Sequence, residues 1–472
     1  MAANELTTLS IAEAGERIRR RSLSPVELTR AYLDRIAARD AECRCYITVL
    51  RDQALAAAAA LEKEVGAGQY RGPLHGIPIG LKDLVMTRGI RTTCGSRILK
   101  DWVPDSDATV ATRLSKAGAV LLGKLNLHEF AYGPTGVNPH YGTARNPWGV
   151  DRMPGGSSSG SGGGVAGFFC AGALGTDTGG SVRIPASLCG IVGLKPTYGR
   201  VSRAGVVPLA WSLDHLGPMT RTVADAAIVL QAMAGQDPAD PSTAAIPVPD
   251  YRSGLKREVC GLRVGLVREL FFERLDPEVR VAVEEAVRAL EGLGVRIEEI
   301  RLPRIQHATP AVFAIISAES MAYHEPYLKT RASEYGADVR ARLLTGQFVL
   351  ATQYLKAQRA RRVLRAEVDD ALRTVDALLT PTTPIPAPRT DEREATVEGA
   401  RDDVRAWLTR CTRPINLTGN PALSVPCGLT TKGLPIGLQL IGRQFDEATL
   451  LRLGHAYEAV SPFRNHRPPH AD

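Results

Sequence analysis

The chain has 472 residues, of which 44% are hydrophobic and 23% are charged, and its formal net charge is +8. These proportions are typical of a folded protein with a sizeable core, and they exclude a largely disordered chain. The densest basic patch, residues 356–373, also contains three acidic residues, so it reads as a solvated helix face and nucleic-acid binding is not expected.

The first part of the chain predicts helices followed by a buried strand. Ser24-Pro25-Val26-Glu27 has the form of a capping box with proline at the first helical position, and the alanine-rich residues 54–64 continue the helical pattern. Residues 72–83 change to glycine, proline and branched side chains, which is typical of a strand that enters a loop. Lys82 lies at that transition. A helix over 107–117 and a strand over 119–126 should follow.

The middle of the chain is unusually rich in small residues, because glycine, serine and threonine dominate residues 155–193. Such flexible backbone costs folding entropy, which indicates that main-chain groups approach something closely there. Beyond it, the pattern predicts a strand over 262–267, a helix from 276, a strand over 295–300 and helices within 310–374. The chain closes with strand candidates at 421–426 and 436–443 and a helix over 446–459.

The N-terminus shows no basic flank followed by an apolar run, and no apolar run approaches the ~20 residues that span a bilayer. The eight cysteines are scattered, which fits reduced thiols better than a disulfide framework. Cys43 and Cys45 form a close pair but lack the ligand spacing of a zinc site. We therefore expect a cytoplasmic protein with neither membrane contact nor bound metal.

Three general motifs match or nearly match the sequence between residues 118 and 167. Residues 162–167 satisfy G-x-G-x-x-G, but no clear strand precedes them, so a dinucleotide site is not expected. Residues 118–124 resemble a phosphate-binding loop, but Leu125 replaces the required serine or threonine. Residues 156–160 match G-x-S-x-G, so an α/β-hydrolase-type esterase with Ser158 as nucleophile remains an alternative.

Three stretches together resemble the catalytic blocks of the amidase signature family. They are GIPIGLKD with Lys82, PGGSSSGS with Ser157, and GALGTDTGGSVRIPASLCGIVGLKPT with Ser181, and the spacings of 75 and 24 residues also agree. The likeness extends over nearly the whole chain, including GKLNLHEFAYG and NPALSVPCGL. One departure is Ser159, which stands where the family usually has glycine and adds a side chain beside the relay serine.

The resemblance implies a hydrolase that cleaves a C–N acyl bond, in an amide, an anilide or a carbamate, without a cofactor. It assigns Ser181 as the nucleophile that becomes acylated, Ser157, on a cis peptide, as the proton relay, and Lys82 as the base. The base must be neutral, so its pKa has to fall from about 10.4 towards 7 or 8, which burial among apolar neighbours could supply.

Other residues of these blocks take secondary roles. The small residues before the nucleophile leave backbone N–H groups free for an oxyanion hole, which we place at Thr178, Gly179 and Gly180. Three residues are assigned supporting roles: Ser158, Asp177 and Arg183. We expect the last two to brace the loop rather than to take part in the chemistry.

The substrate is less clearly indicated. The resemblance places a substrate pocket after the GKLN strand, at Phe130, Tyr132 and Gly133, and partly in the variable region. The stretch 313–328 is apolar with several aromatic residues, which indicates a small apolar or aromatic substrate.

An alternative function is that of the glutaminase component of a tRNA-dependent amidotransferase. Such components hold glutamine with an aspartate shortly before a Pro-x-Asn, and Thr409 stands about there in this chain. We therefore expect a stand-alone enzyme, a monomer or homodimer that acts on a small molecule.

Strands and helices interleave throughout, without repeats or long linkers. The expected fold is α/β, with one large mixed, mostly parallel twisted sheet covered by helices on both faces. We expect a single amidase domain over residues 1–472. It comprises an N-terminal helical segment (1–65), a catalytic core (70–220), a variable substrate-side region (221–377) and C-terminal strands with a helix (378–465).

Overall fold

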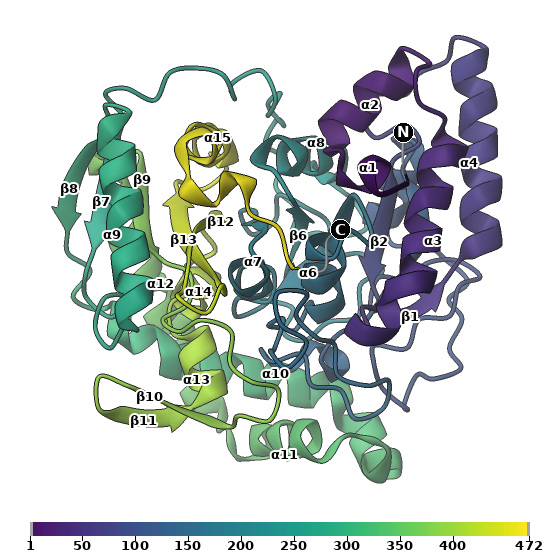
Figure 1. Ribbon diagram of the computed structural model, residues 1–472. Coiled ribbons are helices and arrows are strands. Elements are labelled where there is room, and N and C mark those ends of the chain that lie inside the picture. Colours follow the sequence, from purple (N-terminus) through teal and green to yellow (C-terminus); the bar gives the residue numbers. More distant parts are fainter. Residues whose placement is uncertain (1–2, 470–472) are drawn as a thin grey trace.

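An eleven-stranded mixed sheet runs through the computed structural model, which describes residues 3–469 (Figure 1). Its strand order is β1-β3-β2-β4-β6-β5-β12-β13-β9-β7-β8, and a separate hairpin is formed by β10 and β11. The strands are β1 (Tyr46–Val49), β2 (Pro78–Lys82), β3 (Val120–Leu125), β4 (Gly172–Asp177), β5 (Val192–Lys195), β6 (His215–Thr220), β7 (Arg263–Val267), β8 (Arg296–Ile300), β9 (Ala377–Pro381), β10 (Glu394–Val397), β11 (Ala400–Asp403), β12 (Ala422–Leu429) and β13 (Pro435–Gly442).

The predicted mixed sheet is confirmed, whereas the expectation that most neighbours run parallel is wrong. Parallel pairing is confined to β2 with β3 and β4, and to β7 with β8 and β9. All other neighbours in the sheet are antiparallel. The reason is that β6 lies between β4 and β5 and is antiparallel to both. Although α7 connects β4 to β5 along the chain, these two strands are therefore not neighbours in the sheet.

Helices surround this sheet. They are α1 (Ala3–Thr8), α2 (Ile11–Arg19), α3 (Pro25–Cys43), α4 (Arg51–Gly66), α5 (Thr109–Lys116), α6 (Ser159–Ala166), α7 (Arg183–Cys189), α8 (Val223–Met233), α9 (Pro277–Gly292), α10 (Ala308–Arg331), α11 (Ala337–Thr345), α12 (Ala351–Thr374), α13 (Val404–Thr409), α14 (Arg413–Thr418) and α15 (Glu447–Val460). The first four lie beside the β1 edge, and α9 lies near the opposite edge (Figure 1). The described residues include no helix long and apolar enough to cross a membrane.

The helix expected at Ser24 illustrates how local sequence sets these elements. The Ser24 hydroxyl accepts hydrogen bonds from the N–H groups of Val26 and Glu27, so the N-cap half of the predicted capping box is confirmed at the start of α3. The chain leaves this helix at Arg44, which adopts a left-handed conformation. The predicted strand that ends near Lys82, the strand at 119–126 and the helix from 276 are also confirmed as β2, β3 and α9.

The glycine-rich segment forms a short buried helix, α6, rather than an open loop. A Cβ on Gly160 would lie 2.3 Å from the carbonyl oxygen of Cys45 and 2.5 Å from the nitrogen of Asn126. Only a residue without a side chain fits so close to neighbouring backbone, so the glycine content allows α6 to pack tightly against the sheet.

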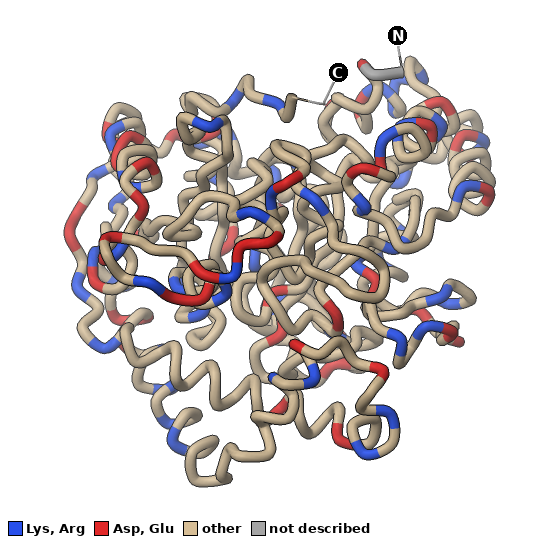
Figure 2. The backbone as a smooth tube through the Cα atoms, turned by 60° about the horizontal axis from the view of Figure 1, so that its bottom comes forward, with Lys and Arg blue, Asp and Glu red and all other residues tan. Residues whose placement is uncertain are grey.

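The last strands join parts of the sheet that come from distant parts of the sequence. β12 pairs with β5 on one side and with β13 on the other, and β13 pairs with β9. Basic and acidic residues are interspersed along the outer segments (Figure 2), in line with the spread of charge in the sequence.

Candidate active site

Lys82 is the last residue of β2, and its ammonium group is buried in the middle of the molecule. Its Nζ donates hydrogen bonds to Ser157 Oγ at 2.7 Å and to Thr176 Oγ1 at 2.8 Å. Burial lowers the pKa of Lys82 to about 7, although Asp214 and Asp177 favour the charged form. A large share of Lys82 is therefore uncharged near neutral pH and can accept a proton.

The loop that carries Ser157 is held against β4. The peptide bond between Gly156 and Ser157 is cis, and both Ser157 and Ser158 are fully buried. The Ser158 hydroxyl accepts from the backbone N–H of Thr176 and donates to its carbonyl oxygen, both at 3.2 Å. This contact engages the Ser158 hydroxyl with the backbone of β4, and Ser158 does not line the cavity described below, which argues against the alternative of an esterase with Ser158 as nucleophile.

Ser181 follows β4 and lies at the wall of a cavity of about 300 Å³. Its carbonyl oxygen accepts a hydrogen bond from the N–H of Ser158 at 3.4 Å, which brings the two serine loops together. Over the described residues, its hydroxyl makes no hydrogen bond to Ser157, as is common for reacting groups before substrate binds. The structure therefore places Lys82, Ser157 and Ser181 in one region, with the hydrogen bond between the hydroxyls of Ser157 and Ser181 not formed.

The backbone before Ser181 supplies fewer free donors than predicted. The N–H of Gly180 donates to Asp177 Oδ1 at 2.8 Å, so the expectation that it belongs to an oxyanion hole is wrong in this structure. Within residues 3–469, the N–H groups of Thr178 and Gly179 have no such partner. The carbonyl oxygen of Gly179 accepts from the Thr412 hydroxyl at 2.7 Å, which fixes the orientation of this loop.

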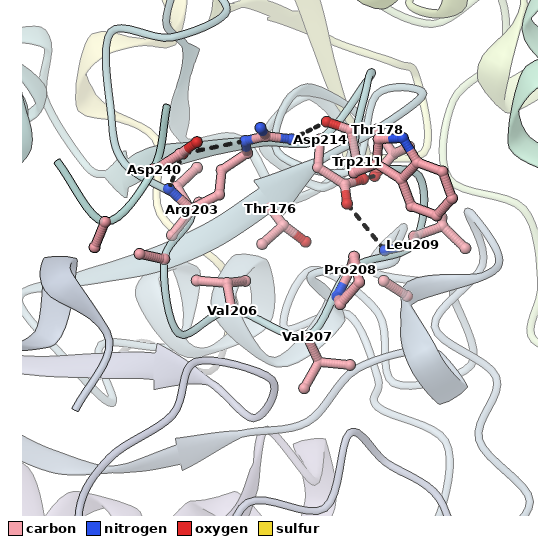
Figure 3. A pocket seen from close by; sticks show the side chains of 14 residues that line it. Thr176, Thr178, Arg203, Val206, Val207, Pro208, Leu209, Trp211, Asp214 and Asp240 are labelled. Atoms are coloured by element: carbon pink, nitrogen blue, oxygen red, sulfur yellow. Dashed lines mark hydrogen bonds and ion pairs between the residues drawn. The ribbon is translucent and has the colours of Figure 1, made fainter. Parts of the chain in front are cut away.

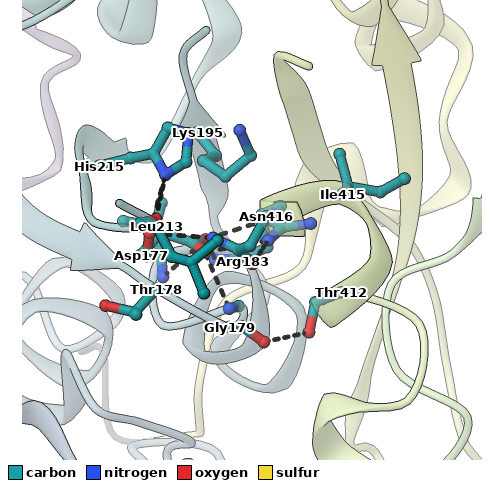
Figure 4. A network of polar contacts seen from close by, with 12 residues as sticks. Asp177, Thr178, Gly179, Arg183, Lys195, Leu213, His215, Thr412, Ile415 and Asn416 are labelled. Carbon is teal, nitrogen blue, oxygen red and sulfur yellow. Dashed lines mark hydrogen bonds and ion pairs between the residues drawn. The ribbon is translucent and has the colours of Figure 1, made fainter. Parts of the chain in front are cut away.

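Asp177 and Arg183 form a buried ion pair that braces the loop that carries Ser181 (Figure 4). Arg183 donates to Asp177 Oδ2 at 3.0 Å and Oδ1 at 2.9 Å. The same guanidinium reaches Gln439 and Asn416, each at 2.6 Å. Although burial opposes ionisation, Arg183 holds the pKa of Asp177 well below its usual range. The pair thus connects the Ser181 loop to α14 and β13.

Removal of Arg183 should destabilise the fold strongly. In Arg183→Met the Asp177 carboxylate would remain buried without its counter-charge, so we expect the free energy of unfolding to fall by about 3–5 kcal/mol. Urea unfolding followed by circular dichroism measures this loss. A decrease below about 1 kcal/mol would contradict the bracing role. Arg183→Lys keeps the charge, so its free energy of unfolding should lie between those of the unaltered protein and of Arg183→Met.

Thr176 is a positioning residue that sequence reasoning missed, because a threonine in a buried strand carries no signal of its own. In Thr176→Val the Lys82 ammonium loses one hydrogen-bond acceptor, so we expect the pKa of Lys82 to fall by about one unit. The amine also loses a contact that orients it towards Ser157, so the plateau value of kcat/KM at high pH should fall about tenfold. The pH dependence of kcat/KM measures both effects. Thr176→Ser keeps the hydroxyl and should behave like the unaltered protein, and equal losses in both variants would argue against this role.

The cavity lining agrees only in part with the predicted substrate pocket. Tyr132 and Gly133 line it, together with Phe313 and Ile316 of α10. Phe130 is buried elsewhere and packs edge-on against His324, with ring centroids 4.4 Å apart, so its assignment to the pocket is wrong. The reason is that Phe130 adopts a left-handed conformation, φ 48°, and the chain turns there. The aromatic residues near His324 therefore form core instead of lining this cavity.

A second cavity of about 250 Å³, drawn in Figure 3, shares part of its lining with the first. Both are lined by Ala131, Thr178 and Leu209. Thr176 and Asp214 also line the second cavity, and Asp214 accepts a hydrogen bond from the Thr178 hydroxyl at 2.5 Å. Burial raises the pKa of Asp214 to about 6. The wall between the two cavities thus contains a residue of the predicted oxyanion hole.

Ser159, the departure from the family pattern, starts α6 and is buried. Its hydroxyl donates to the carbonyl oxygen of Asn126 at 3.5 Å. The extra side chain therefore bonds to the strand-end backbone and leaves the Lys82–Ser157 contact intact.

The fold and the buried lysine–serine pair beside a cavity define an enzyme that acts on amide-type C–N bonds. A family model described as Amidase matches residues 27–451, and the chain belongs to this amidase family, as its motifs predict. Curated relatives and solved structures agree with that assignment.

The similar proteins span different activities within the family. The A component of the glutamyl-tRNA(Gln) amidotransferase from Moorella thermoacetica is 45% identical, with 98% of this chain and 99% of the relative covered. A structure from a vestigial protein complex that reveals the evolutionary origins of an s-triazine catabolic enzyme has a TM-score of 0.92 at 36% identity, covering 96% of this chain and 98% of that one. The native peptide amidase of Stenotrophomonas maltophilia has a TM-score of 0.85 at 34% identity, covering 98% and 99%.

Proposed function

We propose that the protein hydrolyses an amide-type C–N bond of a small molecule through an acyl-Ser181 intermediate. The observation that carries the proposal is the 2.7 Å hydrogen bond between Lys82 and Ser157 beside a cavity lined by Ser181. A lysine with a pKa of about 7 is matched to proton transfer at neutral pH.

In the acylation half, the neutral amine of Lys82 takes the proton of the Ser157 hydroxyl while Ser157 takes the proton of Ser181. The Ser181 oxygen then bonds to the acyl carbon, and the negative charge moves to the carbonyl oxygen. The N–H groups of Thr178 and Gly179 are free to donate to that oxygen. The C–N bond breaks when the proton returns from Lys82, through Ser157, to the departing nitrogen.

In the deacylation half, water replaces the amine. Lys82 and Ser157 remove a proton from the water, its oxygen attacks the acyl carbon, and the proton is delivered to Ser181 as the ester bond breaks. The lysine–serine pair thus acts first as base and then as acid in each half.

The second candidate function is that of the glutaminase component in a tRNA-dependent amidotransferase. Its support is the 45% identity to such a component over nearly the full length of both chains, which is stronger support than the sequence motifs give to a stand-alone enzyme. A partner chain would then be part of the active enzyme, in place of the expected monomer or homodimer. One observation argues against this function: Thr409, which lines the cavity, stands where such components are expected to hold glutamine with an aspartate.

Two assays test these functions. Mass spectrometry of the protein quenched during turnover of an aryl amide or a carbamate should find the acyl group on the peptide that contains Ser181, and an acyl group elsewhere would contradict the proposal. Release of ammonia from glutamine, with and without the other components of an amidotransferase, tests the second candidate. Glutamine turnover only in their presence would favour the amidotransferase component over the stand-alone enzyme.

A further inference from the structure

The cavity beside Ser181 is strongly basic, in contrast to the apolar lining that the sequence predicts. Arg342 of α11, Arg405 of α13 and Arg413 of α14 all line it. The lining of this cavity also includes the acidic side chain of Asp403. The composition of this wall indicates what kind of group can occupy it.

Two of the three arginines already have carboxylate partners. Arg342 donates to Asp338 at 2.5 Å, and its guanidinium lies over the Tyr132 ring, 5.1 Å from the centroid. Arg405 donates to Asp403 through Nε at 2.9 and 3.1 Å and through a terminal nitrogen at 2.5 Å. The positive charges of Arg342 and Arg405 are thus compensated by side chains of the protein.

Arg413 differs from both. Over residues 3–469 its guanidinium has no hydrogen bond or ion pair with the protein, although it is partly buried. Burial, together with the positive charges of Arg342 and Arg405, lowers the pKa of Arg413 to about 10. A partly buried guanidinium without an anionic partner is costly, and its five donors suit a planar carboxylate.

We propose that Arg413 binds a carboxylate of the substrate, so that the enzyme acts on amides that carry a second, anionic group. Arg413 lies close to the nucleophile loop, since a Cβ on Gly179 would be 3.5 Å from its Cγ. A carboxylate held by Arg413 is therefore within a small molecule's length of Ser181. This inference rests on the proposed function and specifies its substrate class.

The same wall is poorly suited to an ammonium group next to that carboxylate. An ammonium group needs an acceptor, and both oxygens of Asp403 already accept from the Arg405 side chain. Thr409 donates its hydroxyl to the carbonyl oxygen of Arg405 at 2.7 Å, and its oxygen offers an ammonium group a neutral acceptor without a compensating charge. We therefore expect glutaramate, which is glutamine without its amino group, to bind better than glutamine.

A binding experiment tests this without knowledge of the natural substrate. A fluorophosphonate reagent should label Ser181, and aliphatic monocarboxylates and dicarboxylate monoamides of increasing length should slow the labelling. For the best of them, we expect Arg413→Met to weaken protection about 10- to 100-fold, as for a lost hydrogen-bonded charge. Neutral amides of the same shape should protect weakly, and equally in both proteins.

Arg410→Met is the matched control. Arg410 precedes α14 and donates to the carbonyl oxygen of Leu270, and it does not line the cavity, so this variant should keep the protection. Arg413→Lys keeps the charge but loses the fork of donors and should retain part of it. Thermal unfolding shows whether each variant is folded.

Turnover distinguishes the two possible positions of the carboxylate. Glutaramate and its homologues carry it on the acyl part, N-acylglycines carry it on the leaving amine, and 5-methylhexanamide is a neutral counterpart of glutaramate. A preference for either anionic series that disappears in Arg413→Met supports the proposal. Equal rates on anionic and neutral amides, or protection unchanged in Arg413→Met, would overturn it. Failure to label Ser181 at all would overturn the proposed function itself, and this inference with it.

Discussion

Ser181→Ala should lose amide hydrolysis almost completely, by about 10⁴- to 10⁶-fold in kcat, while the protein stays folded. Loss of a nucleophile removes the covalent route, and the remaining groups of such a site supply only the residual rate. Ser181 is 8% exposed at the cavity wall, and its hydroxyl holds no neighbouring element in place, so the free energy of unfolding should change little. Steady-state kinetics and urea unfolding measure the two quantities.

Ser161→Ala is the appropriate control for that experiment. Ser161 is a buried serine of α6 whose hydroxyl donates to the carbonyl oxygen of Leu174 at 3.0 Å, so its removal should cost some stability and change the rate by less than about threefold. Near-normal turnover in Ser181→Ala would mean that another group attacks the substrate, and the proposed mechanism would then be wrong.

Lys82→Met should reduce kcat/KM by about 10³-fold or more, because a general base contributes about 10²- to 10⁴-fold and methionine fills a similar volume without accepting a proton. In the unaltered protein the reactive form is the neutral amine, so protonation lowers the rate. Since the pKa of Lys82 is about 7, kcat/KM should rise with pH up to about 8 and then level off.

The pH profile from about 5 to 9 tests this assignment separately from the loss of rate. Lys82→Arg keeps a positive charge that cannot be released, so it should be as inactive as Lys82→Met at every pH. A flat profile between pH 6 and 8 in the unaltered protein would contradict Lys82 as the base.

Local patterns predicted the elements with strong end signals. The N-cap at Ser24 and the proline at the start of α9 each marked a helix that the structure contains. Strand direction could not be derived in the same way, because alternation of strands and helices does not specify which strands become neighbours. The insertion of β6 between β4 and β5 is a property of tertiary pairing, and neither strand's sequence indicates it.

The site was predictable where its residues sit in compact motifs and was missed where they do not. Lys82, Ser157 and Ser181 belong to three recognisable stretches of sequence. Arg342 of α11 and Arg413 of α14 lie 71 residues apart along the chain, so no spacing rule brings them together. Phe130 was misplaced because sequence proximity to the pocket does not set the direction in which a side chain points.

The place of β12 and β13 in the sheet has a consequence for synthesis. These strands lie between β5 and β9, and Gln439 of β13 together with Asn416 of the preceding helix α14 completes the brace around Arg183. Before β12 and β13 have been synthesised, β5 and β9 each leave a sheet edge unpaired, and the loop that carries Ser181 lacks part of its support. Hydrolytic competence should therefore arise only after β13 has been synthesised, and products that terminate before it should be both inactive and prone to associate.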